Sequence, residues 1–323
     1  MLVDSALTLN PADAQEHITI NGSIWYWTVF SVMLASTFAY TGMMFTVPKN
    51  ERLFHYITIG IVFTASVAYF SMASDLGVTP IGIEFVRTGL NNATTRQIFY
   101  ARYIDWFITT PLLLLDLLLL SGLPYATILF TIFMDEVMVV TGLLGALTAS
   151  RYKWGYFTIG CFAFFFVVWQ VVFVARKSAR AIGSDVHRLF VGISLFTLGL
   201  WTLYPISWGL SEGGSVISSD GEAYFYGVLD LLAKPVFGFW LLFGHRGIGF
   251  ERLGLTGWES MRPGSSNNAE GSHEKRSVRT SPVSTMHSSS TPAEPHRTRE
   301  TSGGALHGDS LVSGETARDA ETV

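Results

Sequence analysis

The chain has 323 residues, of which 49% are hydrophobic and only 14% are charged, a balance that argues against a soluble multidomain protein. Its formal net charge is -4 at pH 7, so the composition does not indicate a nucleic-acid-binding protein. The single cysteine, Cys161, excludes an intramolecular disulfide, and we interpret it as a small apolar packing residue.

Seven apolar segments are each long enough to cross a bilayer as a helix of about 20 residues. They run from Ile24 to Val47, Leu53 to Ala73, Thr95 to Leu120, Tyr125 to Leu147, Trp154 to Val174, Leu189 to Leu210 and Ala223 to Phe243. Lys and Arg gather on alternate connections, such as those with Lys49, Arg176 and Arg246, so the positive-inside rule predicts an outside N-terminus and a cytoplasmic C-terminus. This topology leaves four basic residues outside: Arg87, Arg96, Arg151 and Lys153.

We therefore expect an all-α, multi-pass membrane protein with a seven-transmembrane-helix bundle, most consistent with a plasma-membrane location. Its predicted parts are an extracellular tail at residues 1–22, the helical domain at 23–247 and a cytoplasmic Ser/Thr-rich tail at 248–323. The tail has few large apolar residues, so it is predicted to be disordered.

Aromatic and hydroxyl side chains mark the first two spans. Trp25, Tyr26 and Trp27 form an aromatic belt at the outer end of the first span, which we interpret as membrane anchors and not as a site. In the second span, Thr58 and Tyr69 point in nearly the same direction from the helix axis. A hydrogen bond to a neighbouring helix is the commoner use of such buried hydroxyls.

The third span, ARYIDWFITTPLLLLDLLLL, carries polar residues on one face. Within roughly 60° of one another and over about 21 Å of helix lie Arg102, Asp105, Thr109 and Asp116. Structural pairing explains a single intramembrane acid, but two acids on one face with a gap between them look like stations for a proton. The apolar surroundings of Asp116 favour its neutral form, whereas Arg102 is expected to hold Asp105 ionised.

The fourth and sixth spans add acids and aromatic rings. We expect Asp135 to accept a hydrogen bond from Thr110 in a structural role, and Glu136 has no assigned role. The sixth span reads LFTLGLWTLYPISWGL and presents on one face Trp201, Tyr204, Pro205 and Trp208. Such a stripe more often belongs to the packed core, although beside a ligand it would line the binding site of a flat, conjugated molecule.

The seventh span carries Asp230 and Lys234, four residues apart and therefore on the same helical face. They are either a structural ion pair or a site where the lysine condenses with an aldehyde as a protonated Schiff base, with Asp230 as part of its counterion. The preceding loop carries Glu212 and Glu222, which are either solvated surface or a carboxyl pair that holds and releases a proton.

The motifs RYIDWFITTPLLLLD, WTLYPISW and VLDLLAK, in this order, resemble those of the microbial (type I) rhodopsins, most closely the bacteriorhodopsin-like fungal opsins. The resemblance implies all-trans retinal on Lys234, with Asp105 and Asp230 as the counterion complex and Arg102 beneath it. It implies that the polyene and its ring are bound by Trp106, Thr110, Met138, Gly142, Trp201, Tyr204 and Trp208, with Tyr69 near the counterions. Family trimers suggest a homo-oligomer.

The resemblance also implies an activity. Asp105 would accept the Schiff-base proton, and Asp116, assisted by Thr58, would return one from the cytoplasmic side; Glu212 and Glu222 fall where the family keeps its release pair. Because the positions of Asp105, Thr109 and Asp116 match the outward proton-pump pattern, we expect a light-driven transporter of protons, not an enzyme.

Leu113 and Ala233 match green-absorbing members. Three departures from the family are Pro235 after the lysine, Gly155 in place of a second tryptophan, and Glu136, an acid expected near the ring end of the pocket.

Other functions were weighed against the pump. A slow photosensor that signals through the cytoplasmic tail is the main alternative, although Asp116 speaks against it. A light-gated channel would be expected to have a line of acids in the second span, and a receptor without a chromophore would leave the intramembrane charges unexplained. The histidines before the tail are predicted at or beyond helix ends, so no buried pair is expected to bind a metal or haem: His17, His55, His187 and His245.

Overall fold

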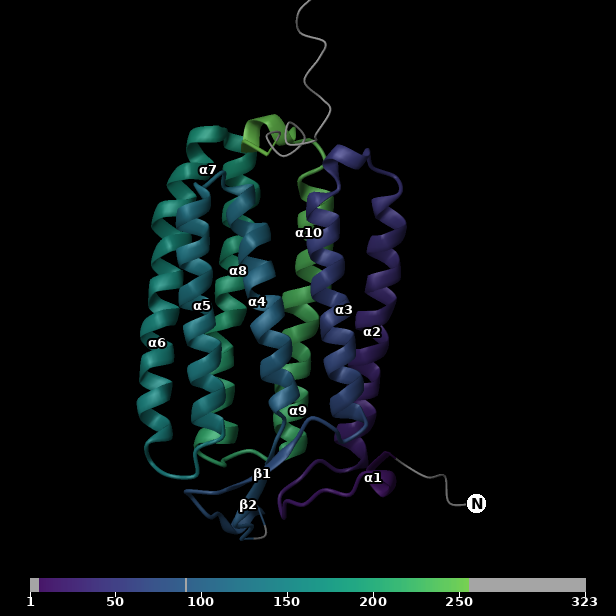
Figure 1. Cartoon of the computed structure of the whole chain (residues 1–323), viewed down its shortest axis with the longest axis vertical. Helices are drawn as coiled ribbons and strands as arrows, with labels where there is room; N and C mark the ends of the chain where they lie inside the picture. Colours follow the sequence, from purple (N-terminus) through teal and green to yellow (C-terminus); the bar gives the residue numbers. More distant parts are fainter. Residues whose placement is uncertain (1–5, 91, 256–323) are drawn as a thin grey trace, which may run out of the picture. The chain divides into compact units, whose positions relative to one another are not determined.

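Long helices stand side by side in this computed structural model, which describes residues 6–90 and 92–255 (Figure 1). In chain order these described residues form α2 (Ile20–Met44), α3 (Leu53–Ala73), α4 (Tyr100–Leu120), α5 (Tyr125–Ala146), α6 (Lys153–Trp169) continued by η3 (Gln170–Ala175) and α7 (Arg176–Ile182), α8 (Ser184–Trp208) continued by η4 (Gly209–Gly213), and α9 (Ser219–Leu231) continued by η5 (Leu232–Val236) and α10 (Phe237–Gly244). Six of these spans are long and apolar enough to cross a membrane, and α2 is the seventh. The predicted seven-helix bundle is confirmed; most of the expected tail lies outside the described residues.

The two ends of the bundle carry different structures. The hairpin end has α1 (Ala6–Leu9), the antiparallel strands β1 (Thr79–Gly82) and β2 (Thr95–Ile98), and η2 (Thr88–Leu90) between them. The tail end has η1 (Lys49–Glu51), the end of α10 and η6 (Phe250–Leu253) (Figure 1). Each span therefore carries the chain from one end of the bundle to the other, and consecutive spans run antiparallel.

The third span begins later than its apolar pattern predicts. The segment Thr95–Ile98 pairs with β1 as a strand, and the helix starts only at Tyr100. The chain before α2 pairs with the other edge of β2, since Gln97 N–H donates to the Glu16 carbonyl at 2.8 Å. Gly77 leads into the hairpin with φ of +69°, and a Cβ there would lie 2.5 Å from the Ala101 Cβ, so glycine is required.

The loop predicted between the sixth and seventh spans is shorter than expected. The sixth span continues as the π-helical turn η4, which contains Glu212. The seventh span begins at Ser219, where the Ser218 hydroxyl caps the helix by accepting a bond from the Gly221 N–H at 3.1 Å. Glu222 lies in the first turn of α9. Both acids are thus held on helices.

The seventh span changes its helical geometry at the lysine. Lys234 and Pro235 lie in the π-helical segment η5, between α9 and α10. Proline has no N–H and cannot complete the α-helical ladder, which explains a local departure from α geometry. The Tyr40 hydroxyl of α2 donates to the Pro235 carbonyl at 2.5 Å and so supports this turn from a neighbouring span.

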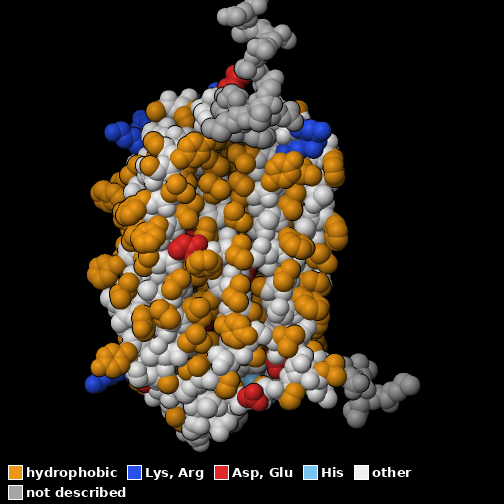
Figure 2. Space-filling model, viewed as in Figure 1, with side chains coloured by type: hydrophobic (Ala, Val, Ile, Leu, Met, Phe, Trp, Pro, Cys, Tyr) orange, Lys and Arg blue, Asp and Glu red, His pale blue; other side chains and the backbone are white. Residues whose placement is uncertain are grey.

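The surface of the bundle is apolar, unlike that of a soluble protein, and its interior holds charged side chains as well as a hydrophobic core. Hydrophobic side chains cover the length of the face seen in Figure 2, with Lys and Arg near its ends. Phe38 and Phe162, for example, are 69% and 70% exposed, whereas Arg102 and Lys234 are buried. Soluble monomers rarely expose such continuous apolar surface, so this arrangement suits a bilayer.

Candidate functional site

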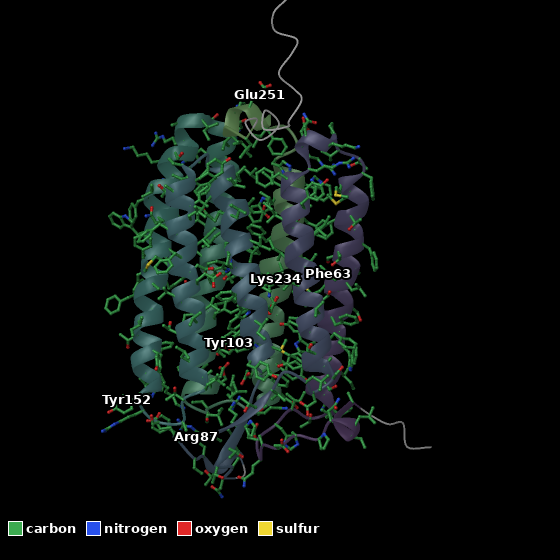
Figure 3. The ribbon with its side chains drawn as sticks, in the orientation of Figure 1. Phe63, Arg87, Tyr103, Tyr152, Lys234 and Glu251 are labelled. Carbon is green, nitrogen blue, oxygen red and sulfur yellow. The ribbon has the colours of Figure 1, made fainter. Side chains whose placement is uncertain are left out.

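An apolar cavity lies inside the bundle, between α4, α5, α6, α8 and the seventh span. It is lined by Tyr103, Trp106, Thr110, Leu113, Met138, Val139, Gly142, Phe157, Gly160, Cys161, Phe164, Trp201, Tyr204, Pro205, Trp208, Tyr226, Asp230 and Lys234. Lys234 lies near mid-height of the bundle, with Glu251 at the tail end, Arg87 at the hairpin end and Tyr103 between Lys234 and the hairpin end (Figure 3). Every residue that the sequence assigned to the ligand lines this cavity except Tyr69.

The Lys234 amine is held between two buried carboxylates. Its Nζ lies 2.7 Å from Asp105 Oδ2 and 2.9 Å from Asp230 Oδ1, so both carboxylates expected beside the lysine are present as ion pairs. The hydroxyls of Tyr69 and Tyr204 donate to Asp230 at 2.6 and 2.7 Å, which fixes that carboxylate from two further spans. An ammonium between acids is the arrangement that a buried cation needs, because each opposite charge offsets its desolvation.

The expectation that Arg102 holds Asp105 is wrong. The Arg102 guanidinium instead bonds to Glu222 at 2.5 Å, lies 3.5 Å from Glu212, and donates to the Tyr26 hydroxyl at 2.8 Å. Its charge is therefore directed away from the lysine, toward the hairpin end. One oxygen of Asp105, Oδ1, has no hydrogen-bond partner among the described residues, so this acid is bonded less completely than Asp230.

The two glutamates form a buried cluster and not a solvated surface. Glu222 is bound by two guanidinium groups, from Arg102 and from Arg96, whose Nη2 lies 2.7 Å from it. Glu212 is bound mainly by neutral donors, the hydroxyls of Tyr103 at 3.1 Å and Tyr226 at 3.2 Å and that of its neighbour Ser211. The cluster is thus asymmetric, with both cations on one carboxylate.

The sequence interpretation missed two members of this cluster. Tyr26 was taken for a membrane anchor, but it is 1% exposed and bonded to Arg102. Arg96 was assigned only to the outer side of the membrane, without a role; its side chain is buried, and its Nη1 also donates to the Ile217 carbonyl at 2.7 Å. An arginine six residues before Arg102, in a short β-prone segment, was the available signal.

The polar residues on the tail-end side of the lysine are separate from one another. Asp116 is completely buried, and neither of its oxygens has a hydrogen-bond partner among the described residues. The Thr58 hydroxyl donates to the backbone carbonyls of Phe54 and His55, not to Asp116. Thr109 likewise bonds to the backbone carbonyl of Asp105 at 2.8 Å.

The expected bond between Thr110 and Asp135 is present, with the Thr110 hydroxyl donating at 2.6 Å. It joins α4 to α5 beside the cavity. Glu136, in contrast, was expected near the ring end of the pocket, but it does not line the cavity and is partly exposed. The neighbouring residue on a helix points about 100° away, which separates these two acids.

The fifth span, α6, forms one wall of the cavity, but neither Trp154 nor Gly155 lines it. Phe157 does so instead, stacked on Trp208 with ring centres 5.0 Å apart. Trp154 packs edge-on behind Trp208 at 5.8 Å. Cys161 lines the cavity one helical turn beyond Phe157, so it is a ligand-facing residue as well as a small packing residue.

The expectation that no histidines are buried together is also wrong. His55 is completely buried and His245 is 5% exposed, with ring centres 6.0 Å apart at the tail end. The sequence predicted both histidines at helix ends, but it did not predict η6, which folds over this end of the bundle. Among the described residues, no group of three or more His, Cys, Asp or Glu side chains is placed to hold a metal ion.

The cavity fits a flat, conjugated aldehyde. Aromatic side chains provide broad apolar walls, and Trp106 has a buried ring N–H without a partner among the described residues. The amine at one wall is the only lysine in the cavity lining, and amines in apolar pockets are the usual groups that bind carbonyl compounds. Two acids next to it would balance the charge that remains on the nitrogen.

Comparison with known proteins agrees with this site. A sequence model of the family Bacteriorhodopsin-like protein matches residues 21–248. Opsin-like protein carO of Fusarium fujikuroi is 54% identical over 258 residues, covering 78% of this chain and 84% of that protein. The light-driven proton pump LR (Mac) from Leptosphaeria maculans is 46% identical with a TM-score of 0.68, covering 72% of this chain and 99% of that one. The light-driven proton pump rhodopsin of Coccomyxa subellipsoidea is 42% identical with a TM-score of 0.67, and the match covers 71% of this chain and 99% of that one.

Proposed function

Since the chain belongs to the bacteriorhodopsin-like proteins, which are multi-pass membrane proteins with a retinal chromophore, we propose that it is a light-driven outward proton pump with all-trans retinal bound at Lys234. The observation that carries this proposal is the pair of buried acids on α4. Asp105 bonds to Lys234 Nζ at 2.7 Å, whereas Asp116 lies eleven residues further along the same helix, without a partner among the described residues.

The order of proton-holding groups along the bundle gives the direction of transport. Glu212 and Glu222 lie toward the hairpin end, Asp105 touches the lysine, and Asp116 lies about 16 Å beyond Asp105 toward the tail end. Basic residues gather at the tail end, which the positive-inside rule assigns to the cytoplasm. A proton that moves from Asp116 toward the glutamates therefore leaves the cell.

Retinal, when bound, supplies a light-driven change of shape next to Lys234 Nζ. Asp105 Oδ2 takes the proton from this nitrogen, because it is bonded directly to it and lacks the tyrosine hydroxyls that hold Asp230. Asp116 later returns a proton to the nitrogen from the opposite side. A carboxyl group surrounded by leucines is suited to hold a proton until an acceptor forms.

The releasing group is Glu212 in this proposal. Its carboxylate is contacted by neutral hydroxyls and only distantly by Arg102, whereas Glu222 is bound by two arginines that stabilise its charged form. When Asp105 takes the proton, its negative charge is neutralised, so the Arg102 guanidinium, which lies 3.5 Å from Glu212, is attracted less strongly toward the lysine side. A shift of Arg102 toward Glu212 would favour loss of the proton from Glu212, because a nearby cation stabilises the carboxylate.

The direct test is the pH of an unbuffered suspension of cells that express the chain with all-trans retinal, under green light. Acidification that a protonophore abolishes is expected for an outward pump. Cells with Lys234→Ala are the matched control, because they keep the bundle but lose the amine. A coloured protein that gives no pH change would contradict the pump and favour a photosensor.

A further inference from the structure

Two histidines that the proposed pump does not use lie together at the tail end. The His55 ring on α3 is completely buried, and neither of its nitrogens has a hydrogen-bond partner among the described residues. The His245 ring, at the end of α10, lies edge-on to it with centres 6.0 Å apart. Buried polar groups without partners are rare, so this imidazole calls for an explanation other than packing.

The hydrogen bonding of His245 leaves one nitrogen for proton exchange. Its Nδ1 lies 2.7 Å from the Leu241 carbonyl oxygen, which can only accept, so Nδ1 carries a hydrogen. In the neutral ring Nε2 is then an acceptor. Burial lowers the pKa of His245, which keeps the ring neutral and ready to accept near pH 7.

His55 lies at about the depth of Asp116. Because α3 and α4 are antiparallel, their register follows from the contact of Gly60 with Leu112, where a Cβ on the glycine would lie 3.6 Å from the leucine Cδ1. Measured from that contact toward the tail end, His55 is about 7.5 Å away along α3 and Asp116 about 6 Å along α4. Both side chains are completely buried and so face the interior of the bundle.

The pair is shielded from solvent by aromatic rings and surrounded by charge. Phe54 and Phe250 pack on His245 with ring centres 4.8 and 6.3 Å away, leaving it 5% exposed. Arg52 and Arg246 are the charged groups that act on His55, whereas Arg246 and Glu51 act on His245. His245 is therefore the outer member of the pair and His55 the inner one.

We infer that His245 and His55 form a two-imidazole relay that carries a proton from the tail-end solvent to Asp116. His245 Nε2 takes the proton and passes it to a ring nitrogen of His55, through a ring rotation or one bridging water. His55 then gives a proton to the Asp116 carboxylate through bridging water, since the two groups are not bonded to each other directly. Both rings end neutral, one proton has moved from solvent to the carboxylate, and no other bond is made or broken. The inference rests on the proposed role of Asp116 as donor.

The test is flash spectroscopy of the full chain with bound retinal, with a pH-indicator dye to follow proton uptake from solution. In His55→Phe, which keeps the ring volume, return of the proton to Lys234 is expected within twofold of the unchanged protein, because Asp116 still supplies it. Proton uptake is expected to slow at least tenfold, within the range of general acid–base catalysis. His245→Gln should slow the same step.

Three outcomes would overturn the relay. Uptake at an unchanged rate in His55→Phe and His245→Gln would show that the rings only fill space. Equal slowing by His187→Gln, a matched change of another tail-end histidine, would show that the effect is not specific to the pair. Slowing of the Lys234 step itself, at unchanged uptake, would place His55 elsewhere in the path. If His55→Phe yields no coloured protein, His245→Gln alone decides between relay and packing. A failed pump is recognised separately, because the unchanged protein then shows no dye signal.

Discussion

Replacement of Asp116 with asparagine tests the central step of the proposed pump. Asn has nearly the shape of Asp but cannot release a proton, so Lys234 must then be reprotonated from solvent. Asp116 is four residues from the tail end of α4, about 6 Å along the helix, and its oxygens have no partner among the described residues that could act in its place. Loss of a placed proton donor slows a transfer by about 10²- to 10⁴-fold, so we expect at least about 10²-fold slower recovery at neutral pH.

The pH dependence of the recovery distinguishes this loss from a general disturbance. With Asp116 present, the donor is inside the protein and the rate should change little with pH around 7. In Asp116→Asn the proton comes from solution, so the rate should fall about tenfold for each unit of pH increase. Flash spectroscopy from pH 6 to 8 measures both rates. Asp135→Asn is the matched control, because Asp135 is also buried but bonded to Thr110. An unchanged recovery in Asp116→Asn, or equal slowing in the control, would refute the assignment.

Three further outcomes are expected. Arg96→Gln should lower the free energy of unfolding in mixed detergent by about 3 kcal/mol, because it breaks a buried ion pair, while Glu222 keeps its second guanidinium; an unchanged value would show that the pair contributes no stability. Gly238→Ala should cost about 1–3 kcal/mol in the same assay, since the new Cβ would lie 2.6 Å from the Tyr40 hydroxyl, whereas Gly199→Ala, with nothing within 4 Å, should be tolerated. The absorption maximum of the purified pigment should lie in the green, and a maximum in the blue would contradict the expectation drawn from the residues beside the retinal.

Features that depend on one helix or on two consecutive spans were predictable from the sequence. The pairing of Asp230 with Lys234 follows from a spacing of four residues, and the bond from Thr110 to Asp135 follows from two adjacent spans at similar depth. The aromatic residues of the sixth span line the cavity because helical periodicity places them on one face. Such patterns fix which face of a span turns inward.

Features that join distant segments were not predictable from helix geometry, and only the resemblance to a family placed Asp105 and Tyr69 beside the seventh span. Arg96 and Glu222 are 126 residues apart, and their contact depends on β2 folding against the start of α9. The sequence therefore assigned Arg102 to Asp105, its neighbour on the helix, although Tyr26 of α2, Glu212 of η4 and Glu222 of α9 bind it more closely. His55 was misplaced for the same reason, since the residues that bury it belong to the other end of the chain.

The π-helical turn at Lys234 affects how the seventh span can change. A turn of this kind holds one more residue than an α-helical turn, so the part of the span after it is rotated by about 100° relative to a continuous α-helix. Residues Phe237–Gly244 therefore meet α2, α3 and α8 in an orientation set by η5 and not by the position of Asp230. Deletion of a single residue in η5 would restore a regular helix but turn either the lysine or the tail-end half out of place. The span thus consists of two helical halves joined at Lys234, and the face that each half turns toward the bundle is set separately.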